Sequence, residues 1–185
     1  DGKGHRARRR RLSLGVRVLD RLPEPPSPAA VRGTLVHSVL EALYDLPAHQ
    51  RTLDEAIGLV APQWDVLVAE RPEVTGMLAE AGTNPSEWLR GAGDLVESYF
   101  AMEDPTRLEP AARELKVQAE LPSGLVLRGF VDRLDRAPTG QVRVVDYKTG
   151  KAPGVGFEAK AMFQMRFYAL VLWRMHGELP TVLQL

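Results

Sequence analysis

Hydrophobic residues in the first part of the chain recur every three or four positions, as on one face of a helix. Ser27 before a proline, Thr52 three residues before a glutamate, and Asn84 before another proline are typical of helix starts. The predicted helices cover residues 28–46, residues 53 onward with an interruption at Pro62, and residues 85–100. The first half of the chain is therefore predicted to be helical.

Beyond Pro110 the hydrophobic period falls to two, which is typical of strands with one buried face. Two turn sequences, Pro122-Ser123-Gly124 and Pro138-Thr139-Gly140, separate three such segments and favour an antiparallel meander. The predicted strands cover residues 114–121, 125–134 and 142–148, followed by a helix over residues 158–176 and a last strand over 181–185. This order predicts an α/β fold with a small mixed sheet and a helical N-terminal part.

Length and composition indicate one globular domain, expected over residues 27–185 after a basic and proline-rich arm over residues 1–26. Hydrophobic content is 44%, charged content is 26%, and no apolar run approaches the roughly 20 residues of a membrane span. We therefore expect a cytoplasmic protein with no membrane partner. The last strand ends abruptly at Leu185, which suggests that a C-terminal portion is missing.

Charge is balanced over the whole chain, with 24 basic and 24 acidic residues, which argues against a generally basic nucleic-acid-binding protein. The first segment is nonetheless strongly basic, with Lys3, Arg6 and four arginines over residues 8–11. Such a run can contact phosphates, but a solvated tail is the more ordinary interpretation. Because the chain has no cysteine, any metal must be bound by oxygen or imidazole, and no iron–sulfur cluster held by cysteine is expected.

Asp132, Asp146 and Lys148 form the most informative polar group in the sequence. In an extended strand Asp146 and Lys148 would point to the same side, and a hairpin would bring Asp132 beside them. Two adjacent carboxylates need a cation, and magnesium or manganese would suit them together with a backbone carbonyl near Tyr147. The metal would polarise a phosphate and activate a water, while Lys148 would orient that water or neutralise charge on phosphorus. The pattern favours phosphodiester hydrolysis.

A simpler interpretation places these residues on the solvent face of an antiparallel sheet, where Asp146 and Lys148 would form a weak surface pair. Val142 and Val144 share that strand face, so it is apolar at one end and charged at the other, which favours the edge of a cleft. Glu114, two strands away in sequence order, is either a further acidic group of the site or a solvent-facing residue.

Further polar residues lie on the predicted helices. His37 is at the margin of the apolar face of the first helix, with Glu41 one turn away, so it is either a ligand facing a cleft or a packed or surface histidine. Lys160, Gln164 and Tyr168 follow one stripe of the later helix. That stripe either faces the sheet or a nucleic-acid backbone, or it borders an apolar helix face.

Four blocks of the sequence together resemble the RecB-type nucleases of the PD-(D/E)XK superfamily. They are residues 33–41 (GTLVHSVLE), residues 129–135 (GFVDRLD), residues 145–150 (VDYKTG), and Gln164 with Tyr168. The resemblance covers the chain from about Leu19 onward and implies a restriction-endonuclease-like core. It implies that His37, Asp132 and Asp146 bind metal, and that Lys148 is catalytic. Gln164 and Tyr168 would belong to the surroundings of the active site.

The resemblance also implies a function. Family members cut DNA, commonly at single-stranded ends, with magnesium or manganese, so we expect a DNA exonuclease of repair or recombination. An imidazole ligand would favour manganese. Because such domains are often joined to a helicase, a helicase or another repair subunit is an expected partner. The alternatives are a nuclease module active only with that partner, and a non-catalytic DNA-binding or scaffold protein of the same fold.

Overall fold

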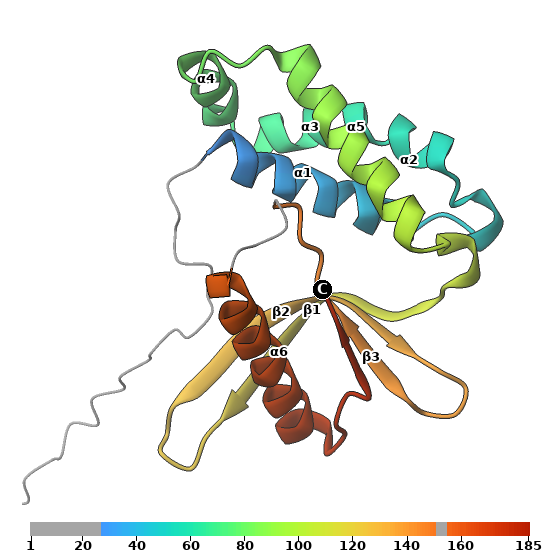
Figure 1. The fold of residues 1–185 in the computed structure, drawn as a ribbon, viewed down its shortest axis with the longest axis vertical. Helices are drawn as coiled ribbons and strands as arrows, with labels where there is room; N and C mark the ends of the chain where they lie inside the picture. The colour runs from blue at the N-terminus through green and yellow to red at the C-terminus, as the bar shows by residue number, and fades with distance from the viewer. Residues whose placement is uncertain (1–26, 151–154) are drawn as a thin grey trace, which may run out of the picture.

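The computed structural model describes residues 27–150 and 155–185, apart from the side chains of residues 155–158 and 160 (Figure 1). The predicted arm over residues 1–26 lies outside the described residues. The helices are α1 (Pro28–Leu43), η1 (Ala48–Gln50), α2 (Leu53–Gly58), α3 (Val60–Glu70), α4 (Glu73–Glu80), α5 (Pro85–Met102), η2 (Pro105–Arg107) and α6 (Val155–His176). The strands are β1 (Pro110–Glu120), β2 (Val126–Arg136), β3 (Val142–Val145) and β4 (Val182–Gln184).

Helices α1 to α5 form one packed unit, the upper part of Figure 1, in which α1 packs against α2, α3, α4 and α5. The predicted caps are present. The Ser27 hydroxyl accepts a hydrogen bond from the Ala30 N–H (3.2 Å), and the Asn84 side chain accepts one from the Ser86 N–H (2.9 Å). The buried residues of this unit, called the helical core below, are Val31, Leu35, Val36, Val39, Leu40, Leu43, Ala56, Val60, Leu67, Val74, Leu78, Trp88, Ala92, Val96 and Tyr99.

The four strands form one sheet in the order β1-β2-β3-β4. The first three are an antiparallel meander, as predicted, and β4 pairs in parallel with β3. Helix α6 packs across one face of β1 and β2 (Figure 1). The buried residues between them, called the sheet core below, are Val117, Ala119, Leu127, Val131, Leu134, Val142, Val144, Met165, Phe167, Tyr168, Val171 and Leu172. The predicted α/β fold with a small mixed sheet is confirmed.

Several helix boundaries differ from the predicted ones. Helix α1 ends at Leu43 rather than at residue 46. The interruption predicted at Pro62 falls at Leu59, because Pro62 occupies the first turn of α3, where its missing N–H leaves no helical bond unmade. Helix α4 was not predicted, and its N-cap residue, Pro72, makes no side-chain capping bond that could have marked it.

Strand β3 ends at Val145, so the predicted extension of this strand to Lys148 is wrong. The Asp146 N–H still donates to the Gln184 carbonyl of β4 (3.0 Å). The Tyr147 N–H instead donates to the Asp132 carboxylate (2.6 Å), so the backbone leaves the ladder at the residues expected to carry chemistry. Among the described residues, no helix has the length and apolar character needed to cross a membrane.

Candidate metal centre between the helices and the sheet

Strand pairing places three acidic residues in one row across the sheet. The residues on either side of Glu114 in β1 pair with the residues on either side of Asp132 in β2, so these two carboxylates are opposite each other. On the other side, Arg133 pairs with Val145 of β3, so Asp146 follows next to Asp132. Glu114 has a φ of +42°, a conformation that residues other than glycine rarely adopt. The strained position lies at one end of the acidic row.

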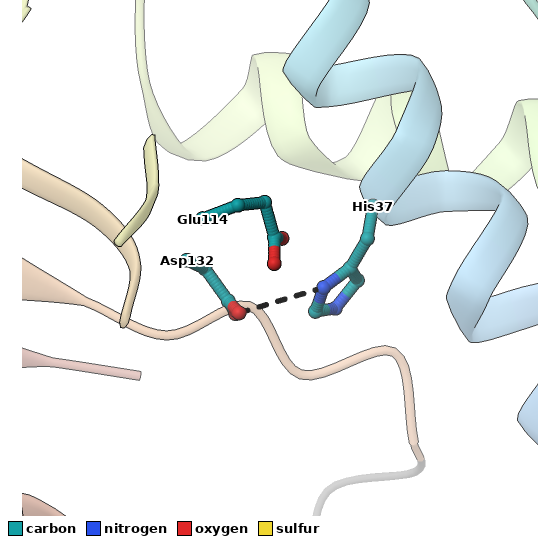
Figure 2. A group of neighbouring side chains, drawn as sticks. All are labelled: His37, Glu114 and Asp132. Atoms are coloured by element: carbon teal, nitrogen blue, oxygen red, sulfur yellow. Dashed lines mark ion pairs between the residues drawn. The ribbon is translucent and has the colours of Figure 1, made fainter. Parts of the chain in front are cut away.

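Helix α1 brings His37 to this row from the other side. One ligand atom from each of His37, Glu114 and Asp132 lies within 4.8 Å of the other two. Figure 2 shows the three side chains converging on the space between α1 and the sheet. Glu114, which the sequence left open between site and solvent, therefore belongs to the group. One imidazole and two carboxylates form a ligand set that suits manganese, and two carboxylates also suit magnesium.

The two ring nitrogens of His37 have different neighbours. Nε2 lies 3.1 Å from the Tyr147 carbonyl oxygen, and Nδ1 lies 3.6 Å from Asp132 Oδ1. In the described part of the chain, the buried Nδ1 has no hydrogen-bond partner. When Nε2 donates its proton to the carbonyl, Nδ1 keeps a lone pair directed at the carboxylates, as in histidines that bind a metal. The Tyr147 carbonyl, predicted as a metal ligand, here contacts His37.

Asp132 is buried, and only 8% of its surface is exposed. Burial, together with the negative charge of Asp146, raises the pKa of the Asp132 carboxyl, although His37 and the hydrogen bond from the Tyr147 N–H act in the opposite direction. Ionised Asp132 is therefore costly in this place unless positive charge is nearby. A divalent cation held by Asp132, Glu114 and His37 would supply it.

Asp146 is also buried, at 4% exposed, and each of its two oxygens has a partner. Gln164 of α6 donates to Oδ1 (2.8 Å), and the Lys148 ammonium pairs with Oδ2. The Tyr168 hydroxyl donates to the Phe130 carbonyl (2.6 Å) and lies 3.1 Å from the Gln164 amide nitrogen. Gln164 and Tyr168 thus face the sheet and orient the Asp146 carboxylate.

Two other residues predicted near the site have less direct positions. Glu41 is exposed at the rim, and its backbone carbonyl accepts a hydrogen bond from Arg113 (2.5 Å). It lines a narrow cleft with His37, Leu40, Tyr44, Arg113, Glu114, Asp132 and Tyr147. The side chain of Lys160 lies outside the described residues.

The residue after Asp132 joins the helices to the sheet. Arg133 is 1% exposed, and its Nη1 lies within hydrogen-bond distance of the hydroxyls of Tyr44, the residue after α1 (2.9 Å), and Tyr99 of α5 (3.2 Å). The same nitrogen lies 2.9 Å from the hydroxyl of Tyr147. The Tyr147 ring packs against the helical core, so this loop residue belongs to both units.

Two carboxylates neutralise the buried arginine. Glu103, directly after α5, accepts from both terminal nitrogens of Arg133 (2.8 and 2.9 Å), and Asp135 lies 3.0 Å from its Nε. Burial by itself would lower the pKa of Arg133, but the hydrogen bonds that it donates to Glu103, together with the negative charge of Asp135, outweigh burial and raise that pKa above its ordinary value. The arginine cluster, as it is called below, consists of Arg133, Tyr44, Tyr99, Tyr147, Glu103 and Asp135.

The sequence did not predict the arginine cluster, and it left open whether Glu114 belongs to the site or faces solvent. Glu114 could have been found from strand register, because antiparallel pairing around the turn at Pro122-Ser123-Gly124 sets it opposite Asp132. Arg133 lies in residues 129–135, one of the blocks that resemble the nuclease family. Its burial could not be predicted, because no period or spacing in the sequence distinguishes a buried arginine from an exposed one. Its partners come from three distant segments of the chain.

Comparison with known protein families gives one finding that covers nearly the whole chain. A family model described as the PD-(D/E)XK nuclease superfamily matches residues 9–183. A search of curated protein sequences finds no match.

Proposed function

We propose that this chain, which belongs to the PD-(D/E)XK nuclease superfamily and is therefore a metal-dependent nuclease, is a RecB-type exonuclease of DNA. Its proposed role is DNA repair or recombination in the cytoplasm, with single-stranded DNA as the favoured substrate. The observation that carries the proposal is the convergence of His37, Glu114 and Asp132 within 4.8 Å, next to Asp146 paired with Lys148.

The metal would be held by His37, Glu114 and Asp132, with Asp146 and the Tyr147 carbonyl as further candidate ligands. Three features support this choice: the unpartnered His37 Nδ1, the raised pKa of Asp132, and the oxygen-rich donor set. When bound, the metal polarises the phosphodiester and makes water a stronger nucleophile at neutral pH. We propose manganese or magnesium, with manganese favoured by the imidazole.

Lys148 is proposed as the catalytic cation. Its side chain is 34% exposed whereas that of Asp146 is 5% exposed, so the ammonium can reach a phosphate while the carboxylate keeps it in place. Hydrolysis adds water to phosphorus and breaks one ester bond, which leaves a phosphate monoester and a free hydroxyl. The ammonium would donate hydrogen bonds to the phosphate oxygens as negative charge grows on them.

The test is cleavage of end-labelled single-stranded and duplex DNA with manganese, magnesium or EDTA. Lys148→Ala should lower the rate about 100- to 1,000-fold, the usual effect of removing one group that stabilises a transition-state charge. Asp146→Ala should abolish cleavage and weaken metal binding as well. Arg71→Ala is the control, because Arg71 is a cation in the helical unit whose partner is the exposed Glu73.

The outcomes separate the proposal from its rivals. Metal-dependent cutting that is lost in Lys148→Ala supports a self-sufficient nuclease, and the labelled products give its polarity. Metal binding without cutting would indicate a module that needs a helicase or another repair subunit. DNA binding with neither metal binding nor cutting would indicate a scaffold of the same fold. Wild-type rates in Lys148→Ala would refute the proposed site.

A further inference from the structure

The two faces of the β1–β2 hairpin are different. On β2, Leu127, Gly129 and Val131 lie beneath α6, and a β-carbon at Gly129 would come within 3.0 Å of the Phe167 ring. The alternate residues, Arg128 and Phe130, are exposed on the other face. Figure 1 shows the hairpin extending away from the helical unit with α6 across one side.

The open face carries an aromatic ring between two cations. Lys116 of β1 is directly opposite Phe130 of β2, and Gln118 is opposite Arg128. Phe130 is 50% exposed and is the one large hydrophobic residue exposed on β1 or β2 among the described residues. Lys116 and Arg128 are exposed, and in the part of the chain that the structure describes neither forms a hydrogen bond or an ion pair. Both charges are thus available to a ligand.

This face leads directly to the candidate metal centre. Phe130 precedes Asp132 by two residues, so both side chains point to the same side of β2 and are about 7 Å apart along the strand. The Phe130 carbonyl is held by the Tyr168 hydroxyl (2.6 Å), and Tyr168 also contacts Gln164 next to Asp146. These hydrogen bonds therefore fix the backbone that carries the Phe130 ring relative to the acidic row.

We infer that Phe130, Lys116 and Arg128 form a binding surface for single-stranded DNA, on which the nucleotides beside the cleaved phosphate lie. Phe130 stacks on one base, and the two cations contact phosphates. Bases of a duplex already stack on one another and are not free to do this, so the surface selects single strands. The inference rests on the proposed nuclease function, because the surface is placed by its distance from the metal centre.

The composition of the face argues against a protein partner. A protein interface needs a buried apolar centre, and this face offers one isolated ring. Positive charge flanking an aromatic ring is complementary to a chain of phosphates and bases.

The test is binding of fluorescent oligothymidylate by fluorescence anisotropy in EDTA, where no cleavage occurs. Phe130→Leu should weaken binding about 5- to 150-fold, because leucine is apolar but cannot stack on a base. Phe130→Trp, which can still stack, should bind about as tightly as the wild type. Duplex binding should change little. The matched control is Trp173→Leu, since Trp173 is an aromatic residue of α6 that is 46% exposed.

Salt dependence tests the two cations. Lys116→Gln and Arg128→Gln should each reduce the slope of log affinity against log salt by about 0.7, the value for one phosphate contact to a single strand. Arg174→Gln on α6 is the control. Unmeasurable binding by the wild type, or equal affinity of Phe130→Leu and wild type, would overturn the inference.

Cleavage assays on the same variants separate this inference from the proposed function. If the wild type cuts and Phe130→Leu binds as well as wild type, the surface is refuted and the nuclease stands. If no metal supports cutting while binding still depends on Phe130, the nuclease proposal fails and the binding surface stands.

Discussion

The helical core and the sheet core share no residue, yet the candidate metal centre takes residues from both sides. His37 comes from α1, and Glu114 and Asp132 come from β1 and β2. Each unit buries its own apolar side chains independently of the other. The group that could hold a metal exists only where the two units meet, so correct folding of each unit is necessary but not sufficient for the site.

The junction between the units is polar where each core is apolar. Arg133 of β2 pairs with Glu103 and Asp135, and its Nη1 lies within hydrogen-bond distance of three tyrosine hydroxyls. Buried ion pairs pay a desolvation cost that offsets much of their attraction, so they add less stability than apolar packing but demand one geometry. The two cores therefore supply stability, while the arginine cluster fixes their relative position.

The largest effect should come from breaking the junction. Arg133→Met leaves Glu103 and Asp135 with the partly exposed Arg143 as their remaining cation, and should lower the free energy of unfolding by about 3 kcal/mol. Urea denaturation measures it, and cleavage should be lost in parallel. Arg136→Met, which breaks the exposed pair with Glu178, should leave stability nearly unchanged. Equal stability of the two variants would show that the cluster does not join the units.

Metal binding should stabilise the protein, because the candidate ligands come from both units. At manganese about 100-fold above its dissociation constant, the wild type should gain about 2.7 kcal/mol, and Asp132→Asn should lose this gain. Without metal, Asp132→Asn should have a higher melting temperature than the wild type. The substitution removes a buried carboxylate whose pKa is raised, and therefore removes the cost of ionising it in the folded protein. Asp94→Asn, an exposed change on α5, is the control in calorimetry. A metal response in Asp132→Asn equal to that of the wild type would exclude Asp132 as a ligand.

Independence of the two cores predicts additive losses. Val39 and Val171 are each 0% exposed, one in the helical core and one in the sheet core. Truncation of either to alanine should cost about 2 kcal/mol, and the double variant should lose the sum to within about 0.5 kcal/mol. Urea denaturation of the three variants gives the answer. A larger departure from the sum would mean that the cores are coupled through more than the polar junction.

The smallest expected effect is confined to the sheet unit. Tyr168→Phe removes the hydrogen bond to the Phe130 carbonyl and keeps the ring, so it should cost about 1 kcal/mol. Hydrogen exchange measured by mass spectrometry should show faster exchange in α6 and β2, with α1 unchanged. Equal acceleration in α1 would place both units in one cooperative structure.

The sequence predicted the order of elements because local signals determine it. Capping at Ser27 and Asn84 and the glycine turns before β2 and β3 each act within a few residues. The predicted end of β3 lies three residues beyond the observed one, because the Tyr147 N–H donates to the Asp132 side chain and not to a neighbouring strand. That hydrogen bond depends on a residue fifteen positions away, which no local pattern reveals.

The site was predicted in part for the same reason. Asp132 and Asp146 were expected to be neighbours from one hairpin, and the register agrees. The position of Glu114 depends on the pairing of a second hairpin, β1 with β2, and on its own positive φ. The tyrosines around Arg133 come from the end of α1, from α5 and from the loop after β3, and only packing of the two units brings them together.

Tyr147 has a consequence for inhibition. Its ring packs against the helical core, its hydroxyl contacts Arg133, its N–H binds Asp132, and its carbonyl contacts His37. A compound that wedges into the narrow cleft and displaces this one ring would disturb an acidic ligand and the imidazole at once. Because His37, Glu114 and Asp132 line the same cleft, such a compound would compete with the metal, and raising the metal concentration should restore cleavage.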